Sequence, residues 1–147
     1  MFNVTLDTNI LVSAFISKRK EYRILRLAKL GKIKLSLSLE ILEEFKEVIS
    51  RPKFGFSQEQ INQATKQLLS TSELLITSTK IDTVKEDPDD NKILECSLDG
   101  KSDFIISGDN HLLNLKEYKN IKIIKSREFL EKYKATKNVK RSPNAKN

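Results

Sequence analysis

The chain has 147 residues, and its hydrophobic content of 38%, with four glycines and three prolines, excludes a disordered protein and predicts one packed domain. No apolar run approaches the roughly 20 residues of a membrane span, and no signal-type segment opens the chain, so we expect a soluble cytoplasmic protein without a membrane partner. The single cysteine, Cys96, excludes an internal disulfide framework and lies in an apolar helical pattern, which indicates a buried thiol.

The net charge of +7 is concentrated near the C-terminus. Residues 132–147 contain six basic and no acidic residues, whereas residues 1–131 contain 21 Lys and Arg against 20 Asp and Glu. Residues 135–147 have little apolar content, so we predict a flexible basic tail after a domain of residues 1–134. Such a tail could attract phosphates, or it could be a solubilising extension without a specific partner.

The first half of the chain alternates between strand and helix patterns. Alternating runs of β-branched and aromatic residues predict strands, and apolar stripes at three- and four-residue spacing predict helices. We expect strands at 2–6 and 33–37, and helices at 10–16, 22–30, 39–50 and 58–69. Gly31 is a plausible helix stop, and Ser38 and Ser57 are predicted helix caps. Leu74 to Ile76 fit either a short strand or the end of the preceding helical region.

The second half repeats this alternation. A helix is expected after Pro88, a buried strand at 104–106, a short helix at Leu112 and Leu113, a strand at 121–124, and a helix from a cap at Ser126 through about Tyr133. This order predicts an α/β protein, a three-layer α/β/α sandwich with a mainly parallel sheet of about four to five strands. The absence of a Gly-rich phosphate loop argues against nucleotide binding of the Rossmann or P-loop kind.

Carboxylates follow two of the predicted strands directly. Asp7 lies between the apolar segments 2–6 and 10–16, and Asp109 comes just after the strand at 104–106. Ligands of open α/β sheets bind at the carboxyl ends of the strands, where several side chains can be aimed at one point. Asp7 and Asp109 are therefore candidate functional residues.

Helical geometry selects one acid from the four in the helix at 39–50. At about 100° per residue, Glu44 lies roughly 100° from the centre of the apolar stripe. Glu40 lies about 140° away, and Glu43 and Glu47 about 160° away. We expect Glu44 to flank the buried face and the other three to face solvent.

The same geometry selects Asp90 in the helix after Pro88. Asp90 falls within about 20° of the centre of the apolar face, whereas Asp89 falls roughly 120° away. Asp87 is a good helix cap with Pro88 at the first helical position. We therefore expect Asp90 to point inward, and we interpret Asp87 and Asp89 as residues that form the turn.

The candidates Asp7, Glu44, Asp90 and Asp109 predict a metal site. Clustered carboxylates raise one another's pKa unless a cation neutralises them. An all-oxygen cluster suits one or two Mg²⁺ or Mn²⁺ ions, and the lack of Cys and His in it argues against zinc. Because such ions activate water and stabilise a leaving oxygen, phosphodiester hydrolysis is the expected reaction.

Five segments carry a resemblance to a known family: residues 6–12, 38–45, 51–54, 87–95 and 104–109. Together they resemble the PIN domain family of metal-dependent ribonucleases, most closely its toxin-like branch related to the VapC toxins, over residues 2 to 133. The resemblance implies endonucleolytic cleavage of single-stranded RNA, with products that carry 5′-phosphate and 3′-hydroxyl ends. It also implies a cognate antitoxin protein and a homodimer.

The family's four acids fall on the four residues that geometry selects. By this resemblance Asp7, Asp90 and Asp109 would hold Mg²⁺ or Mn²⁺ directly or through water, and Glu44 would ligate or orient the attacking water. Two more residues would support the site: Asn9 would help to order it, and the hydroxyl of Ser107 would position a carboxylate or a phosphate.

The chain departs from the family pattern after the fourth acid. The family often has a further acid or an aromatic residue there, whereas this chain has Asn110, His111 and Leu112, which leaves the coordination of a second metal open. His111 could touch a phosphate, although a lone loop histidine is more often incidental.

Two alternative functions remain. A PIN-fold module could bind RNA or a protein without turnover. A phosphotransfer domain such as a receiver needs paired acids after the first strand, and only Asp7 is found there.

Overall fold

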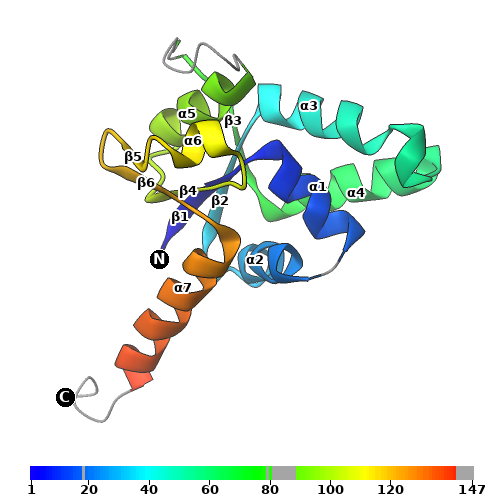
Figure 1. Ribbon diagram of the computed structural model, residues 1–147. Coiled ribbons are helices and arrows are strands. Elements are labelled where there is room, and N and C mark those ends of the chain that lie inside the picture. Colours follow the sequence, from blue (N-terminus) through cyan, green and yellow to red (C-terminus); the bar gives the residue numbers. More distant parts are fainter. Residues whose placement is uncertain (18, 79, 81–88, 142–147) are drawn as a thin grey trace.

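Six strands form one sheet in the order β3-β2-β1-β4-β6-β5, in which all neighbours are parallel except β5 and β6 (Figure 1). The computed structural model describes residues 1–17, 19–78, 80 and 89–141. The strands are β1 (Asn3–Leu6), β2 (Lys34–Ser38), β3 (Glu73–Leu75), β4 (Phe104–Ile106), β5 (Glu117–Tyr118) and β6 (Ile121–Ile124). Of the two interpretations of residues 74–76, the strand is correct. The sequence did not predict β5, because two residues are too few to show an alternating pattern.

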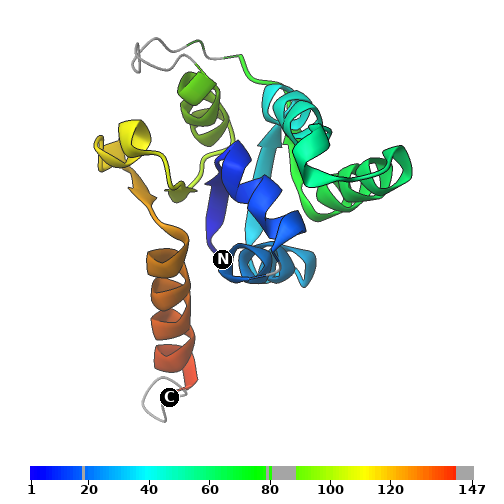
Figure 2. The ribbon, with the colours of Figure 1, turned by 45° about the vertical axis from the view of Figure 1, so that its right-hand side comes forward.

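Helices pack on both faces of the sheet and complete the predicted three-layer α/β/α sandwich (Figures 1 and 2). They are α1 (Thr8–Ile16), α2 (Lys20–Lys29), α3 (Leu39–Ile49), the 3-10 helix η1 (Pro52–Phe54), α4 (Gln58–Thr71), α5 (Asp89–Asp99), α6 (Asn110–Leu113) and α7 (Ser126–Arg141). From β1 the chain continues to β2 and then to β3 at one edge of the sheet. α5 then connects β3 to β4, which lies on the other side of β1. Right-handed crossovers in opposite directions place α1 and α3 on one face and α5 on the other.

Several helix ends form as the sequence predicts. The Ser38 hydroxyl accepts the backbone N–H of Ile41 at 3.2 Å at the start of α3. Ser57 and Gln60 form a reciprocal capping box at the start of α4. Gly31 has a φ of +73° just after α2, a conformation that glycine adopts without a steric penalty. The Ser38 cap sets where β2 ends and where α3, the helix of Glu44, begins.

The core lies between the sheet and its helices. The predicted apolar stripe of α3 is fully or nearly fully buried: Ile41, Leu42, Phe45, Val48 and Ile49. The rings of Phe2, Phe104 and Phe129 pack with centroids 5.2 to 6.0 Å apart and hold α7 against β1 and β4. Cys96 is fully buried as expected, and burial raises the pKa of its thiol to about 11.

The last helix differs from the prediction at both ends. α7 continues through Arg141, beyond the expected end near Tyr133, so it includes residues 135–141 of the predicted tail. The low apolar content of this segment indicated a tail, yet lysine, arginine and alanine are all good helix formers. Ser126 is the first helical residue and not a cap, and its buried hydroxyl has no hydrogen-bond partner among the described residues.

Asp87 and Pro88, the predicted cap and first helical residue, lie outside the described residues, as does the end of the tail from residue 142. Asp89 is the first described residue of α5. Among the described helices, none has the length and apolar character needed to cross a membrane.

Candidate metal centre

The sheet has a topological switch point between β1 and β4. These strands are parallel neighbours with Leu6 opposite Ile106, and the chain leaves β1 towards β2 but leaves β4 towards β6. The backbone N–H of Asp7 donates to the carbonyl of Ile106 at 3.0 Å, which holds the two strand ends together. Connections that diverge in this way open a crevice at the carboxyl ends of the strands. The two predicted strand-end acids, Asp7 and Asp109, both follow these strands.

Asp7 is a buried carboxylate, 6% exposed, with a partner for each oxygen. Its Oδ1 accepts the backbone N–H of Asn9 at 3.3 Å and so caps α1, and its Oδ2 accepts the hydroxyl of Ser107 at 2.6 Å. Burial raises the pKa of Asp7, and the nearby charges of Asp109 and Glu44 raise it further, while the two hydrogen bonds lower it. The charged form is therefore well oriented but electrostatically costly, which a nearby cation would relieve.

Ser107 connects the two strand-end acids. Its hydroxyl donates to Asp7 and accepts the backbone N–H of Asp109 at 2.9 Å. Asp109 caps the short helix α6, because its Oδ1 accepts the backbone N–H of His111 at 2.7 Å. The other oxygen of Asp109, Oδ2, accepts no hydrogen bond from the described residues. Ser107 therefore contacts the carboxylate of Asp7 and the backbone of Asp109, and its supporting role at the site stays a prediction.

Glu44 reaches the crevice from α3. It is half-buried, and the hydroxyl of Thr8 donates to its Oε1 at 2.5 Å. Thr8 is itself buried in the first turn of α1. The predicted position of Glu44 at the border of the buried face is therefore correct, and α1 fixes its orientation.

The other acids of α3 largely follow the angular prediction. Glu43 and Glu47 are exposed as expected. Glu40 was expected to face solvent but is half-buried, because its Oε2 accepts the hydroxyl of Thr77 at 2.7 Å. Thr77 lies just after β3, and the angular prediction could not include this contact because it uses only the residues of α3 itself.

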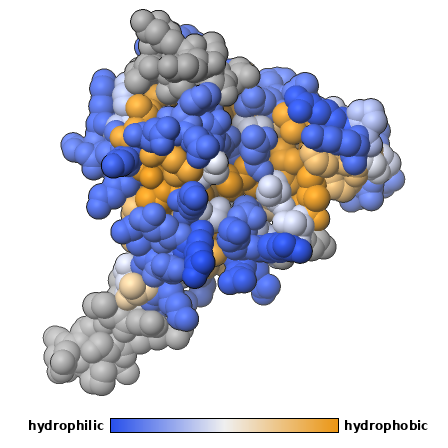
Figure 3. Space-filling view, viewed as in Figure 1, coloured by the Kyte–Doolittle hydropathy of each residue, from blue (hydrophilic) through white to orange (hydrophobic). Residues whose placement is uncertain are grey.

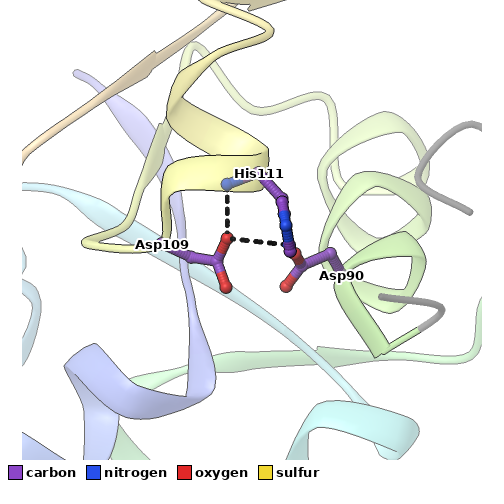
Figure 4. A group of neighbouring side chains, drawn as sticks. All are labelled: Asp90, Asp109 and His111. Atoms are coloured by element: carbon purple, nitrogen blue, oxygen red, sulfur yellow. Dashed lines mark hydrogen bonds and ion pairs between the residues drawn. The ribbon is translucent and has the colours of Figure 1, made fainter. Parts of the chain in front are cut away.

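Asp90 points inward from the first turn of α5, as predicted, and is 6% exposed. Figure 4 shows it facing Asp109 and the ring of His111 across the crevice. One ligand atom of each of these three residues lies within 4.8 Å of the others. The ring Nδ1 of His111 also lies 3.8 Å from Oδ1 of Asp109.

All four predicted acids line one cavity of about 220 Å³. The remaining lining residues are Thr8, Asn9, Val48, Arg51 and Ile93. Arg51 is the only cation in this lining, and its guanidinium pairs with Glu47 at 3.3 Å. The arrangement is a polar, acid-rich hollow at the switch point of the sheet.

Comparison with known families identifies the family of the chain. A family model described as PIN domain matches residues 3–111, a span that includes all four acids. The chain belongs to the PIN domain family. This confirms the family that the sequence motifs indicated, and the match ends at His111.

Proteins of known structure with a similar fold were also found. One match is a chain in the crystal structure of VapBC2 from Rickettsia felis bound to a DNA fragment from their promoter. The TM-score is 0.60 at 18% identity, with 82% of this chain and 96% of the other chain covered. At this identity the likeness shows the fold. A search of curated proteins found no match.

The residues of this PIN domain fit a divalent cation. Asp90, Asp109 and His111 come closest to one another, and Asp7 and Glu44 line the same cavity outside that tight group. Carboxylate oxygens suit Mg²⁺ and Mn²⁺, and a single imidazole beside them is compatible with a first-row metal such as Mn²⁺. Since the acids are brought together and two of them, Asp7 and Asp90, are buried, their mutual repulsion favours a bound cation.

The sequence did not assign three of the residues at the site to it, although it left His111 open as a phosphate contact. Thr8 orients Glu44, Arg51 lines the cavity, and His111 lies beside Asp90 and Asp109. None of the three has a pattern of its own in the sequence. Thr8 and His111 are recognisable only because they lie within two residues of Asp7 and Asp109, and Arg51 was interpreted with Pro52 as the end of a helix.

Proposed function

We propose that this PIN domain is a Mg²⁺- or Mn²⁺-dependent endoribonuclease that hydrolyses single-stranded RNA. The single observation that carries the proposal is the cavity in which Asp7, Glu44, Asp90 and Asp109 meet from β1, α3, α5 and β4. An acid-rich hollow repels a phosphodiester unless a cation lies between them. The same cation, when bound, lowers the pKa of a water and stabilises the leaving oxygen.

The roles of the acids follow from their environments. Asp7, Asp90 and Asp109 would hold the metal directly or through water, and Ser107 would keep Asp7 in place through its short hydrogen bond. Glu44 would ligate or orient the attacking water. Thr8 occupies only Oε1 of Glu44, and Oε2 accepts no hydrogen bond from the described residues, so it is available to take a proton from that water. The products would carry 5′-phosphate and 3′-hydroxyl ends.

We further propose that the chain acts as a cytoplasmic toxin, forms a homodimer and is neutralised by a cognate antitoxin. The fold likeness to a chain of the VapBC2 complex supports this proposal. A small open reading frame beside the gene is the natural antitoxin candidate.

The enzymatic proposal is tested with purified protein and an unstructured RNA in Mn²⁺. We expect cleavage that a chelator abolishes. Glu44→Gln should lower kcat by at least about 100-fold, the usual size of a lost acid–base contribution. Glu43→Gln is the matched control, since Glu43 is an exposed neighbour on the same helix, and it should cleave like the wild type. Binding of RNA without turnover in any divalent metal would instead support a silent RNA-binding module.

A further inference from the structure

The positive charge of the chain is carried by two helices that pack against each other. α2 contains four basic residues and one acid, and α7 contains six basic residues and two acids. The rest of the chain contains equal numbers of basic and acidic residues, so these helices account for the whole net charge of +7. α2 and α7 are distant in sequence but are in direct contact (Figure 1). Their contact creates one basic surface that neither helix provides alone.

A groove runs along the contact between the two helices. It consists of two adjoining hollows of about 270 and 350 Å³ that share Arg23, Leu130 and Lys134. Arg23 and Arg26 of α2 form one wall, and Lys134 of α7 faces them from the other. Figure 3 shows that the lower part of this face, where these helices lie, is covered mainly by hydrophilic residues. We call this feature the α2–α7 groove.

Three of the five cations that line the α2–α7 groove lack acidic partners, whereas Lys20 pairs with Glu21 and Arg127 with Glu131. Arg23, Arg26 and Lys134 are exposed, and none makes an ion pair within the part of the chain that the structure describes. Glu131 is the only acid that lines the groove, and its carboxylate is engaged by Arg127 at 3.3 Å. Three neighbouring positive charges without counter-charges repel one another, so the groove is suited to a polyanion.

An aromatic ring lies among these cations. Tyr133 lines the groove together with Leu27, Leu30 and Leu130, and Leu30 is 57% exposed. Tyr133 also borders a third hollow, which Lys32 and Lys137 line as well. Proteins that bind single strands combine a positive groove for the phosphates with aromatic and apolar side chains that contact the bases.

We propose that the α2–α7 groove binds the backbone of single-stranded RNA, as a second contact surface for the RNA that the metal centre is proposed to cleave. The groove lies beside the amino ends of the strands, where Lys32 leads into β2, and the acid-rich cavity lies at their carboxyl ends. A strand that bridges the two must span the length of the sheet. The positive charges of the groove attract the phosphate backbone, which the four carboxylates of the cavity repel.

Binding of RNA without turnover tests the proposal directly. The probe is a labelled, unstructured RNA of about 20 nucleotides, longer than the roughly 4–16 nucleotides that one module covers. Affinity is measured in chelator from about 50 to 200 mM salt. The triple variant R23Q/R26Q/K134Q should bind at least about tenfold more weakly, and its salt slope should fall by about 2, because each lost phosphate contact on a single strand removes about 0.7.

The matched control is K46Q/K66Q/K122Q, which removes the same charge from exposed lysines on α3, α4 and β6. It should bind RNA within about twofold of the wild type, since phosphate contacts act locally at physiological salt. Equal losses in both variants would overturn the proposal in favour of a net-charge effect. An unchanged affinity of the groove variant would also overturn it and would favour an acidic protein segment as the occupant.

A cleavage assay separates this proposal from the enzymatic one. The groove variant should cleave an RNA of about four nucleotides at the wild-type rate and the long RNA with a lower kcat/KM, because only the long strand reaches the groove. Normal cleavage of the long RNA by the groove variant would refute the groove and leave the nuclease standing. If no RNA is cleaved by the wild type, the nuclease proposal fails while the binding assay still decides the groove.

Discussion

Ser107→Ala should lower both the stability of the protein and its response to Mn²⁺, because the Ser107 hydroxyl positions Asp7 at the metal centre. The change removes the 2.6 Å hydrogen bond to the buried Asp7 and the acceptor of the Asp109 N–H. A hydrogen bond to a charged group contributes about 1.5–3 kcal/mol. For a chain of this size each kcal/mol moves Tm by about 2–4 °C, so a loss of roughly 3–12 °C is expected. The variant should also need more Mn²⁺ for half-maximal cleavage, because Asp7 is no longer oriented.

Ser97→Ala is the control for this experiment. Ser97 is also fully buried, but its hydroxyl donates to the neutral carbonyl of Leu94 within α5. Its loss should cost less, about 0.5–1.5 kcal/mol, and alanine's helix propensity offsets part of that. Thermal unfolding and Mn²⁺ titrations are compared for both variants, with Ser107→Thr as the conservative rescue. If Ser107→Ala loses no more stability than Ser97→Ala and keeps the Mn²⁺ dependence of the wild type, Ser107 does not position Asp7.

Four further outcomes are expected. Thr8→Val should lower kcat about tenfold through loss of the hydrogen bond that orients Glu44, and an unchanged kcat would exclude that role. In chelator, the free energy of unfolding should fall as pH rises from 3.8 through the raised pKa of Asp7, because the folded state keeps the proton of Asp7 to a higher pH than the unfolded state does. Urea unfolding of Asp7→Asn should lack this pH dependence. Identical pH profiles for the two proteins would contradict the prediction. Mn²⁺ at 100 times its Kd should stabilise the wild type by about 2.7 kcal/mol and stabilise Asp90→Asn much less; equal thermal shifts would place the ion elsewhere. Expression in bacteria should stop growth, and co-expression of a small open reading frame found beside the gene should restore it, whereas growth without that partner would argue against a toxin.

Positions set by local patterns could be predicted from the sequence. Asp7 and Asp109 follow buried strands, and parallel strands bring such positions to one edge of the sheet. Glu44 and Asp90 follow from helical angles, because the apolar stripes of α3 and α5 are regular enough to define an inward direction. The family motifs agree with these four residues and extend the prediction to the family itself.

Contacts between distant segments could not be predicted in this way. Glu40 is half-buried because it accepts a hydrogen bond from Thr77, and the Thr8 hydroxyl of α1 donates to Glu44 of α3. The basic residues of the C-terminal segment were visible in the sequence, but their helix and its packing against α2 were not. The α2–α7 groove depends on that packing, so only the structure reveals it.

The most direct test of the metal centre is the cleavage rate of a defined single-stranded RNA by purified Asp7→Asn beside the wild type in Mn²⁺. Asparagine keeps the shape of the side chain and removes the charge that the metal requires. The wild type should produce fragments with 5′-phosphate ends, and Asp7→Asn should lose at least about 100-fold in rate. Undiminished cleavage by Asp7→Asn would contradict the account, because the activity would then come from another site or from a contaminant.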